Sequence, residues 1–440
     1  MAVKKMKMNW QLLFNVVSII FIIGCILYFG GRLTYYYLDS KKVIKQESNL
    51  IFTILKNNNP IVTEADGLYK IKNELVFKGK EVKNYVEYSG YIWRVIKINE
   101  NKSVKLIMDK PITSLIYGDD TNYNQSNISN WLNEVEGIGG SGLFFSTLNN
   151  PYKYLSSTEY CLDILDEDIN NKCKNEVKDQ LVTILNIDDY KTMNLDKSFV
   201  NNEKVSWLLE KDKEDNLLYI NEKGNILKTN NYESLGVKPV ITINQRINVK
   251  SGNGSKELPI KFEDEKVYVN RVVKIDNDIW NIIEDKDNIL KLSLAKINNT
   301  LAYSNKTSKF DINNYKNIAY YLNNTFLNSL TYKDKLLEGT FYNSELSDEE
   351  GYKYINFFNN KIKAKVGLLN MIDIKNNDLT DYYLMNLTSK LGEVAFVYNR
   401  SGKNNESLVN VKKGIVPVIF INKDNIKEGS GELNNPYVVK

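Results

Sequence analysis

The sequence predicts an α+β protein in which an N-terminal transmembrane helix is followed by two tandem strand-rich α+β domains. Three observations lead to this prediction. An apolar run without a charged side chain extends from Met8 to Gly31. Five short motifs occur twice, in the same order, over the rest of the chain. Short apolar runs bounded by Asn and Gly outnumber segments of helical periodicity, which favours strands with a few inserted helices.

The composition is that of a globular protein and names no activity. The chain has 440 residues, of which 42% are hydrophobic and 25% charged. The net charge of +4 is small for this length and argues against a nucleic-acid partner, which would require many cations to neutralise phosphates. There is no histidine, so the commonest general base and metal ligand is missing, and three cysteines cannot form a four-cysteine zinc site. We therefore expect no catalytic residues, no cofactor and no metal.

The N-terminal apolar run predicts a membrane anchor. It is long enough for a helix to cross a hydrocarbon core of roughly 30 Å. Trp10 and Tyr28 lie near its ends, where amphipathic rings favour the membrane interface. Three lysines precede the run and favour a cytoplasmic N-terminus. We predict that residues 1–9 are cytoplasmic and that residues 10–31 span a bacterial cell membrane once. The rest of the chain then lies outside the cytoplasm.

Two other interpretations of this segment stay open. The sequence Ile22-Ile23-Gly24-Cys25 is similar to a bacterial lipobox, which would make Cys25 an acylated residue. The apolar residues that follow Cys25 depart from that pattern, and a small apolar residue inside a helix is the simplest role for it. Cleavage of the segment and secretion of the remainder is the third interpretation.

Residues 32–60 are predicted to form a stalk helix or linker. The spacing of Leu38, Val43, Ile51 and Leu55 allows a helix that continues outward from the membrane. Three asparagines followed by Pro60 are expected to end it.

The rest of the chain shows an internal duplication. Each of five motifs is followed by a similar one, and the spacing between the two members changes slowly along the chain. We predict a first ectodomain over residues 61–260 and a duplicate over residues 261–440. The paired motifs are Tyr91 to Ile96 with Asp278 to Ile283, Trp131 to Asn133 with Tyr321 to Asn323, Thr183 to Asp188 with Gly367 to Ile372, Gly236 to Ile241 with Gly414 to Ile419, and the glycine-rich ends with Pro259 and Pro436.

Within each copy the apolar patterns predict several strands and one short helix. Ser126 is a natural N-cap for the helix of the first copy, because its hydroxyl can accept a bond from a free backbone N–H group. Asn221 to Gly224 reads as the loop of a hairpin. The first copy is expected to have strands at 86–98, 104–108, 181–185, 217–220, 226–228 and 237–243, with a helix at 126–135. The second copy is expected to have elements at 289–294, 318–326, 366–369, 394–398 and 415–421.

These motifs, in this order, resemble those of a bacterial domain of unknown function, family 6273, over roughly Leu68 to Tyr437. The family pattern runs through a W-R-V-I strand, an S-x-I-x-x-W-L-N helix, a W-L-R-S segment and a G-V-R-P-A strand. Its layout is similar to the C-type-lectin-like fold, so the resemblance implies that fold for each copy. The positions of this chain that match are Trp93, Arg94, Trp131, Asn133, Trp207, Lys238 and Pro239 in the first copy, and Trp280, Asn323 and Pro417 in the second.

The second copy departs from the family pattern at its polar positions. The basic residue of G-V-R-P is Lys238 in the first copy and Val416 in the second. Arg94 is matched by Asn281. We therefore expect any binding side chains to lie in the first copy, while the Trp and Pro positions of both copies serve core packing and turn geometry.

Cys161 and Cys173 lie in one inserted segment. Outside the cytoplasm they can form a disulfide, because that environment lacks the reducing thiols of the cell interior, and two inert thiols are the alternative structural role. A catalytic thiol would lack the usual histidine base. The acidic run between them imitates a calcium loop, but Asn171 replaces the required glycine and Val177 the final glutamate.

Two function hypotheses follow. The first is a membrane-anchored surface protein whose tandem ectodomains bind an envelope polysaccharide or another surface protein without catalysis. The second is an envelope glycan hydrolase that uses two carboxyl groups about 5–10 Å apart. A scaffold or sensor subunit of an envelope complex is a further alternative.

Overall fold

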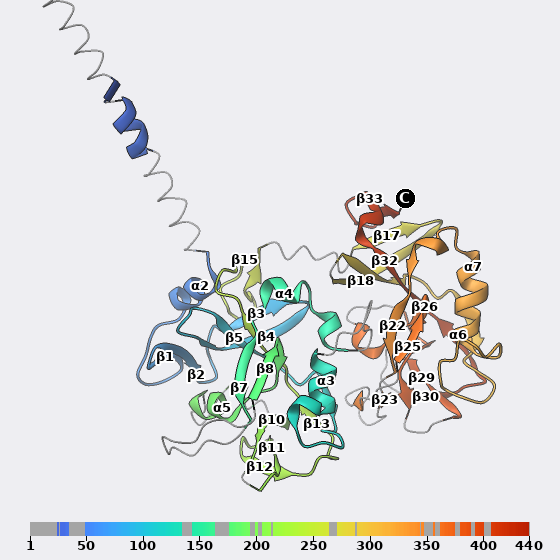
Figure 1. The fold of residues 1–440 in the computed structure, drawn as a ribbon, viewed down its shortest axis with the longest axis horizontal. Helices are drawn as coiled ribbons and strands as arrows, with labels where there is room; N and C mark the ends of the chain where they lie inside the picture. Colours follow the sequence, from blue (N-terminus) through green and yellow to red (C-terminus); the bar gives the residue numbers. More distant parts are fainter. Residues whose placement is uncertain are drawn as a thin grey trace, which may run out of the picture.

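A computed structural model gives the fold (Figure 1). It describes residues 24–25, 27–34, 49–133, 143–162, 176–193, 199–200, 205–212, 214–263, 271–286, 288–343, 345–346, 355–356, 361–374, 379–388, 392–399 and 406–439. None of the helices in these ranges is long and apolar enough to cross a membrane. Most of the predicted membrane segment 10–31 lies outside the described residues, as do Cys173 and the acidic run before it.

The first half, residues 49–263, is built mainly from strands. Its larger sheet has seven strands, in the order β1-β2-β4-β5-β14-β9 with β3 paired to β4. A five-stranded sheet has the order β12-β11-β10-β13-β6. The elements are α2 (Ile51–Asn58), β1 (Gly67–Ile71), β2 (Glu74–Lys78), β3 (Tyr85–Tyr88), β4 (Tyr91–Ile98), β5 (Val104–Met108), β6 (Thr113–Leu115), η1 (Tyr123–Gln125), α3 (Asn127–Asn133), η2 (Phe145–Thr147), α4 (Pro151–Tyr154), β7 (Thr158–Cys161), β8 (Glu176–Gln180), β9 (Val182–Thr183), α5 (Ile187–Met193), β10 (Ser206–Lys211), β11 (Leu217–Ile220), β12 (Ile226–Thr229), β13 (Leu235–Val237), β14 (Val240–Ile243), β15 (Val249–Ser251) and β16 (Lys261–Phe262).

The second half, residues 271–439, is also mainly strands. Its larger sheet has the order β21-β32-β19-β18-β17-β34-β33, with β26 paired to β32, and a five-stranded sheet has the order β20-β31-β27-β29-β30. The elements are β17 (Val272–Ile275), β18 (Asp278–Lys286), β19 (Ile289–Leu294), β20 (Asn299–Ala302), α6 (Ile318–Tyr321), the π-helical turn η3 (Leu322–Phe326), α7 (Leu327–Ser329), η4 (Lys333–Lys335), β21 (Leu336–Leu337), β22 (Gly339–Tyr342), β23 (Glu345–Leu346), β24 (Ile355–Asn356), β25 (Lys361–Ala364), β26 (Val366–Leu368), η5 (Met371–Asp373), β27 (Tyr382–Tyr383), β28 (Leu387–Thr388), β29 (Val394–Tyr398), β30 (Glu406–Leu408), β31 (Lys412–Ile415), β32 (Pro417–Asn422), η6 (Lys423–Asn425), β33 (Ile426–Glu428) and β34 (Tyr437–Val439).

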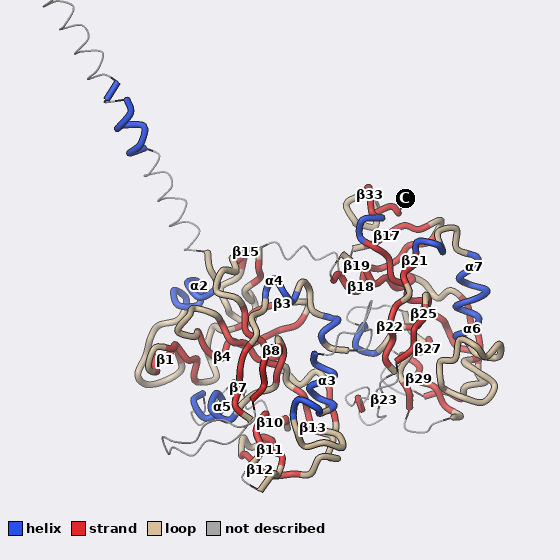
Figure 2. Tube along the Cα trace, in the orientation of Figure 1, coloured by secondary structure: helices blue, strands red, loops and turns tan. Residues whose placement is uncertain are grey.

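Strands dominate both halves, and short helices are inserted between them (Figure 2). The predicted mostly-β α+β class is confirmed. The predicted helix over 126–135 is observed as α3, and the Ser126 hydroxyl accepts a bond from the Ser129 N–H group at 3.1 Å, as the N-cap prediction requires. The predicted hairpin is confirmed as β11 and β12, with Gly224 at a φ of 82° in its loop.

The two halves share the central part of their strand order. The path β4-β5-β14-β9 of the first half corresponds to β18-β19-β32-β26 of the second, and β12-β11-β10-β13-β6 corresponds to β30-β29-β27-β31-β20. Both five-stranded sheets contain one parallel pair at the same place, β10 with β13 and β27 with β31. The register also shifts at matching points, between Val95 and Lys97 and between Ile282 and Glu284.

A side-chain bridge is repeated as well. Asn133, the last residue of α3, donates to the Val182 carbonyl at 2.7 Å and accepts from the Val182 N–H group at 3.1 Å. Asn323 makes the same two bonds to Val366, at 2.8 and 3.1 Å. Each asparagine thereby ties the helix to a short strand next to the core of its half.

Replacing Asn133 with alanine is expected to lower the free energy of unfolding by about 1–3 kcal/mol, because it leaves two backbone groups of β9 without partners. Asn323→Ala is expected to have a similar effect on β26. Urea denaturation measures both. Asn130→Ala is the control, since it makes the same change on α3 at a half-buried position; equal losses for Asn130→Ala and Asn133→Ala would contradict the role of the bridge.

Two predicted strands are divided in the structure. The segment predicted over 86–98 is the hairpin β3–β4, with Ser89 and Gly90 at φ values of 56° and 74° in its turn. The strand predicted over 237–243 is split between β13 and β14, which belong to different sheets. Pro239 lies between them and has no N–H group to donate to a ladder. The run predicted over 415–421 divides in the same way into β31 and β32.

The predicted stalk over 32–60 is wrong in its outer part. The α2 helix packs onto the first half, where Ile51 and Leu55 are fully buried. The Ile51 N–H group donates to the Ile247 carbonyl at 3.1 Å. From residue 49 the chain therefore belongs to the first half, because the apolar face of α2 is buried against it and the backbone at residues 49–51 bonds to residues 247–249.

Candidate functional site

The tryptophans of the family motif serve the core. Trp93, Trp131, Trp207 and Trp280 are all fully buried. Trp93 and Trp131 both pack against Phe144, with ring centroids 6.4 and 5.6 Å apart. Such large buried side chains account for stability rather than for binding.

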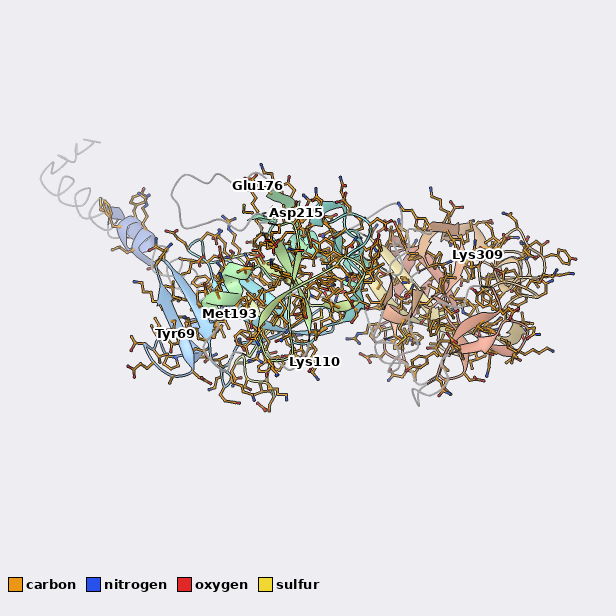
Figure 3. All side chains as sticks on the ribbon, turned by 90° about the horizontal axis from the view of Figure 1, so that it is seen from below. Tyr69, Lys110, Glu176, Met193, Asp215 and Lys309 are labelled. Carbon is orange, nitrogen blue, oxygen red and sulfur yellow. The ribbon has the colours of Figure 1, made fainter. Side chains whose placement is uncertain are left out.

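Two charged residues of the motif, Arg94 and Lys238, lie in one place, which we call the basic cluster together with their neighbours Asp109, Tyr85 and Phe199. Arg94 on β4 and Val240 on β14 both lie opposite Ile107 of the intervening strand β5. Lys238 immediately precedes β14, and Asp109 immediately follows β5. Three adjacent strands thus bring the two cations and a carboxylate together. Lys110, the neighbour of Asp109, is labelled in Figure 3.

Arg94 is buried, with 5% of its surface exposed. Its Nε donates to Asn84 Oδ1 at 2.5 Å and its Nη1 to the Tyr85 hydroxyl at 2.8 Å. The same Nη1 lies 3.5 Å from Asp109 Oδ1. The guanidinium carbon lies 3.8 Å from the centre of the Tyr85 ring and 4.6 Å from that of Phe199. Its Nη2 has no hydrogen-bond partner, so a buried cationic donor is left unused.

Lys238 is 3% exposed and makes one long bond, from Nζ to the Val200 carbonyl at 3.4 Å. Burial lowers the pKa of Lys238 to about 8, while Asp109 acts to raise it and Arg94 to lower it. Burial likewise lowers the pKa of Arg94 below its ordinary value, against the opposing effects of Tyr85 and Asp109. The two buried cations therefore lie near the Asp109 carboxylate, and the charge of Glu81 also acts on Arg94.

The second half lacks this arrangement. Asn281 lies opposite Val272 on β17, as Arg94 lies opposite Tyr85 on β3. Val416, between β31 and β32, stands where Lys238 stands between β13 and β14. Neither residue carries a charge, so the chemistry of the basic cluster belongs to the first half alone.

A second set of buried charges occurs in both halves. Lys105 on β5 pairs with Asp189 on α5, and Lys291 on β19 pairs with Asp373 on η5 at 2.7 Å. Burial acts to lower the pKa of Lys105, but the Asp189 carboxylate overrides it and holds that pKa above its ordinary value. These pairs were not foreseen in the sequence. Their signal is a lysine inside an otherwise apolar strand.

Glu210 on β10 is 6% exposed, and burial raises its pKa to about 8. Both carboxyl oxygens accept the Ile187 N–H group, at 2.9 and 3.0 Å, so Glu210 caps the start of α5. Figure 3 labels Met193 at the other end of this helix. Hydrogen bonding to the helix end makes this a structural role.

The cysteines are partly described. Cys161, at the end of β7, is disulfide-bonded, and Cys25 has a free thiol. Cys173 lies outside the described residues, so its pairing with Cys161 stays a prediction, as does acylation of Cys25. Within the described ranges no three His, Cys, Asp or Glu side chains are grouped as metal ligands.

No protein family, curated protein or solved structure matches this chain. Membership of the bacterial family named above and the C-type-lectin-like fold therefore stay predictions that rest on the motifs.

Proposed function

We propose that this chain is a membrane-anchored bacterial surface protein whose tandem ectodomains bind an envelope component without catalysis, and that the basic cluster of the first half makes the contact. The apolar run before Arg32 supports the anchor. The shared central strand order and the repeated asparagine bridge support two copies of one domain.

The observation that carries the proposal is the retention of Arg94 and Lys238 in one copy only. Arg94 contacts Asp109, but Lys238 makes no ion pair among the described residues, and burying this second cation lowers stability. The second copy shows that the same strand arrangement forms with Asn281 and Val416 instead. Side chains that cost stability and that the fold does not need are characteristic of functional sites.

The chemistry of the cluster indicates the kind of group it binds. A guanidinium and an ammonium are the side chains that hold carboxylate and phosphate groups in proteins. Tyr85 and Phe199 add ring faces beside the guanidinium. An acidic group of an envelope polysaccharide or of another surface protein would occupy the donors that Arg94 and Lys238 leave unused.

Binding of the full chain, in detergent, to fractionated envelope polymers and to membrane-surface proteins tests this function. We expect capture of an acidic component that weakens as salt concentration rises, because the contact is electrostatic. Arg94→Gln should lose the captured component. Arg246→Gln, which removes an exposed arginine of the same half, is the matched control and should keep it. Absence of capture by the wild-type chain, or equal capture by both variants, would refute the proposal.

A further inference from the structure

The second half contains a buried group of reactive side chains that the proposed function does not use. The three residues are buried: Lys291 is 1% exposed, Asp373 9% and Glu284 6%. Lys291 Nζ lies 2.7 Å from Asp373 Oδ1 and 3.9 Å from Glu284 Oε2. Glu284 on β18 and Lys291 on β19 are direct cross-strand neighbours.

We propose that Lys291 and Asp373 react with each other to form an amide cross-link, with Glu284 carrying a proton from the nitrogen to the departing oxygen. The inference is independent of whether the basic cluster binds an anion. It rests on the placement of a nucleophile, an electrophile, a proton carrier and a backbone donor in a site closed to water.

The reaction balances within the pair. The ammonium first gives a proton to Oδ1 of Asp373, which leaves an amine and a carboxylic acid in contact. The amine nitrogen attacks the Asp373 side-chain carbon, and the C–Oδ1 bond breaks after Glu284 has moved one proton from nitrogen to Oδ1. The products are one Nζ–C amide bond and one water molecule, and Glu284 returns to its starting form.

The remaining oxygen of Asp373 is already held by a backbone donor. Oδ2 accepts the Asn370 N–H group at 2.9 Å, in the capping box that starts η5. This donor is positioned for the charge that develops on Oδ2 during the attack, as a backbone N–H group is in an oxyanion hole. Because the fold already holds Lys291 Nζ against the Asp373 carboxyl group, the attack does not require the entropy loss of a bimolecular encounter.

Side chains of the first half lie close to the site. Lys286, two residues beyond Glu284, lies with Nζ 4.9 Å from the centre of the Phe145 ring. Tyr91 of the first half is close enough for the charges of Asp373 and Glu284 to add to the effect of burial in raising its pKa. In water an ion pair is favoured over an amide, but a dry interior removes the hydration of both ions. Expulsion of one water molecule then leaves a neutral bond in their place.

The first half provides an internal comparison. Lys97 stands at the position of Glu284, opposite Lys105 on the neighbouring strand, and both lysines pair with Asp189. The second carboxylate there, Glu74, contacts Lys97 at 3.0 Å and stands on a different strand from Lys97 and Lys105, and no hydrogen bond from a described backbone N–H group to the Asp189 carboxylate is present. We expect this pair to remain ionic.

Tryptic mapping of the reduced full chain by mass spectrometry tests the cross-link. We expect residues 287–296 to be joined through Lys291 to residues 366–375, with a mass lower by one water than the sum of the two peptides. Peptides that contain Lys105 and Asp189 should be linear. Recovery of only linear peptides around Lys291 and Asp373 from the wild-type chain overturns the proposal.

Two variants test the role of Glu284. Glu284→Gln should yield linear peptides of full mass, and cooperative thermal unfolding checks that this variant is folded. Glu338→Gln, which removes an exposed carboxylate of the same half, should keep the cross-link complete. A full cross-link in folded Glu284→Gln would overturn the assignment of the proton-carrying step.

Discussion

Replacing Asp189 with alanine is expected to destabilise the folded chain by about 3–5 kcal/mol, the larger of the two strongest effects predicted here. The substitution leaves Lys105, which is 3% exposed, as a buried cation without its partner. Lys97 also loses its contact with Asp189 at 3.2 Å. The penalty arises from the charge left behind in the low-dielectric interior, and not only from the lost attraction.

Guanidinium chloride denaturation of the full chain measures this loss. Asp188→Ala is the matched control, because it removes an exposed carboxylate from the same first turn of α5. We expect Asp188→Ala to change the free energy of unfolding by less than about 1 kcal/mol. Similar losses for the two variants would contradict the importance of the buried pair.

Replacing Lys238 with methionine is expected to stabilise the chain by about 2–3 kcal/mol near neutral pH, since burial holds the folded-state pKa at about 8, below its ordinary value. The unfolded lysine keeps its proton up to its ordinary pKa, whereas the folded one loses it from about pH 8. In the wild-type chain this lysine therefore makes stability rise with pH through that window. Below about pH 8 the folded chain must bury the protonated form of Lys238, and the free energy of unfolding is therefore lower than at high pH.

Thermal denaturation across this pH range compares the wild-type chain with Lys238→Met. The difference between them should be largest near neutral pH and should shrink as the pH rises above about 8. Lys250→Met, at an exposed position of the same half, is the control and should be nearly neutral. A destabilised Lys238→Met, or a difference that does not depend on pH, would show that Lys238 has counter-ions and would weaken the argument for a binding site.

Much of the fold was readable from the sequence because its signals are local. The Ser126 hydroxyl caps a helix by accepting a hydrogen bond from the Ser129 N–H group, only three residues away. Gly224 adopts the positive φ that its hairpin turn requires and that other residues rarely adopt. Pro239 marks the break between β13 and β14 in the sequence, but the change of sheet was not readable, because short apolar strands have the same pattern whichever sheet they join.

The candidate site was predicted only in part. Arg94 and Lys238 stand in recognisable motifs, and their loss in the second copy is visible in the sequence. Their partners Asp109, Tyr85 and Phe199 come from separate segments, and only strand order and register bring them together. The same holds for Glu284 and Asp373, which lie far apart in the chain and meet at Lys291.

The most direct test of the binding function is the affinity of Lys238→Met for the captured envelope component, measured by titration calorimetry beside its stability. A functional basic cluster predicts that this variant gains stability and loses binding by at least about tenfold, a combination that unfolding cannot produce. Arg246→Gln should bind as the wild-type chain does. Unchanged affinity in a Lys238→Met variant that has gained stability would contradict the assignment of the basic cluster as the binding site.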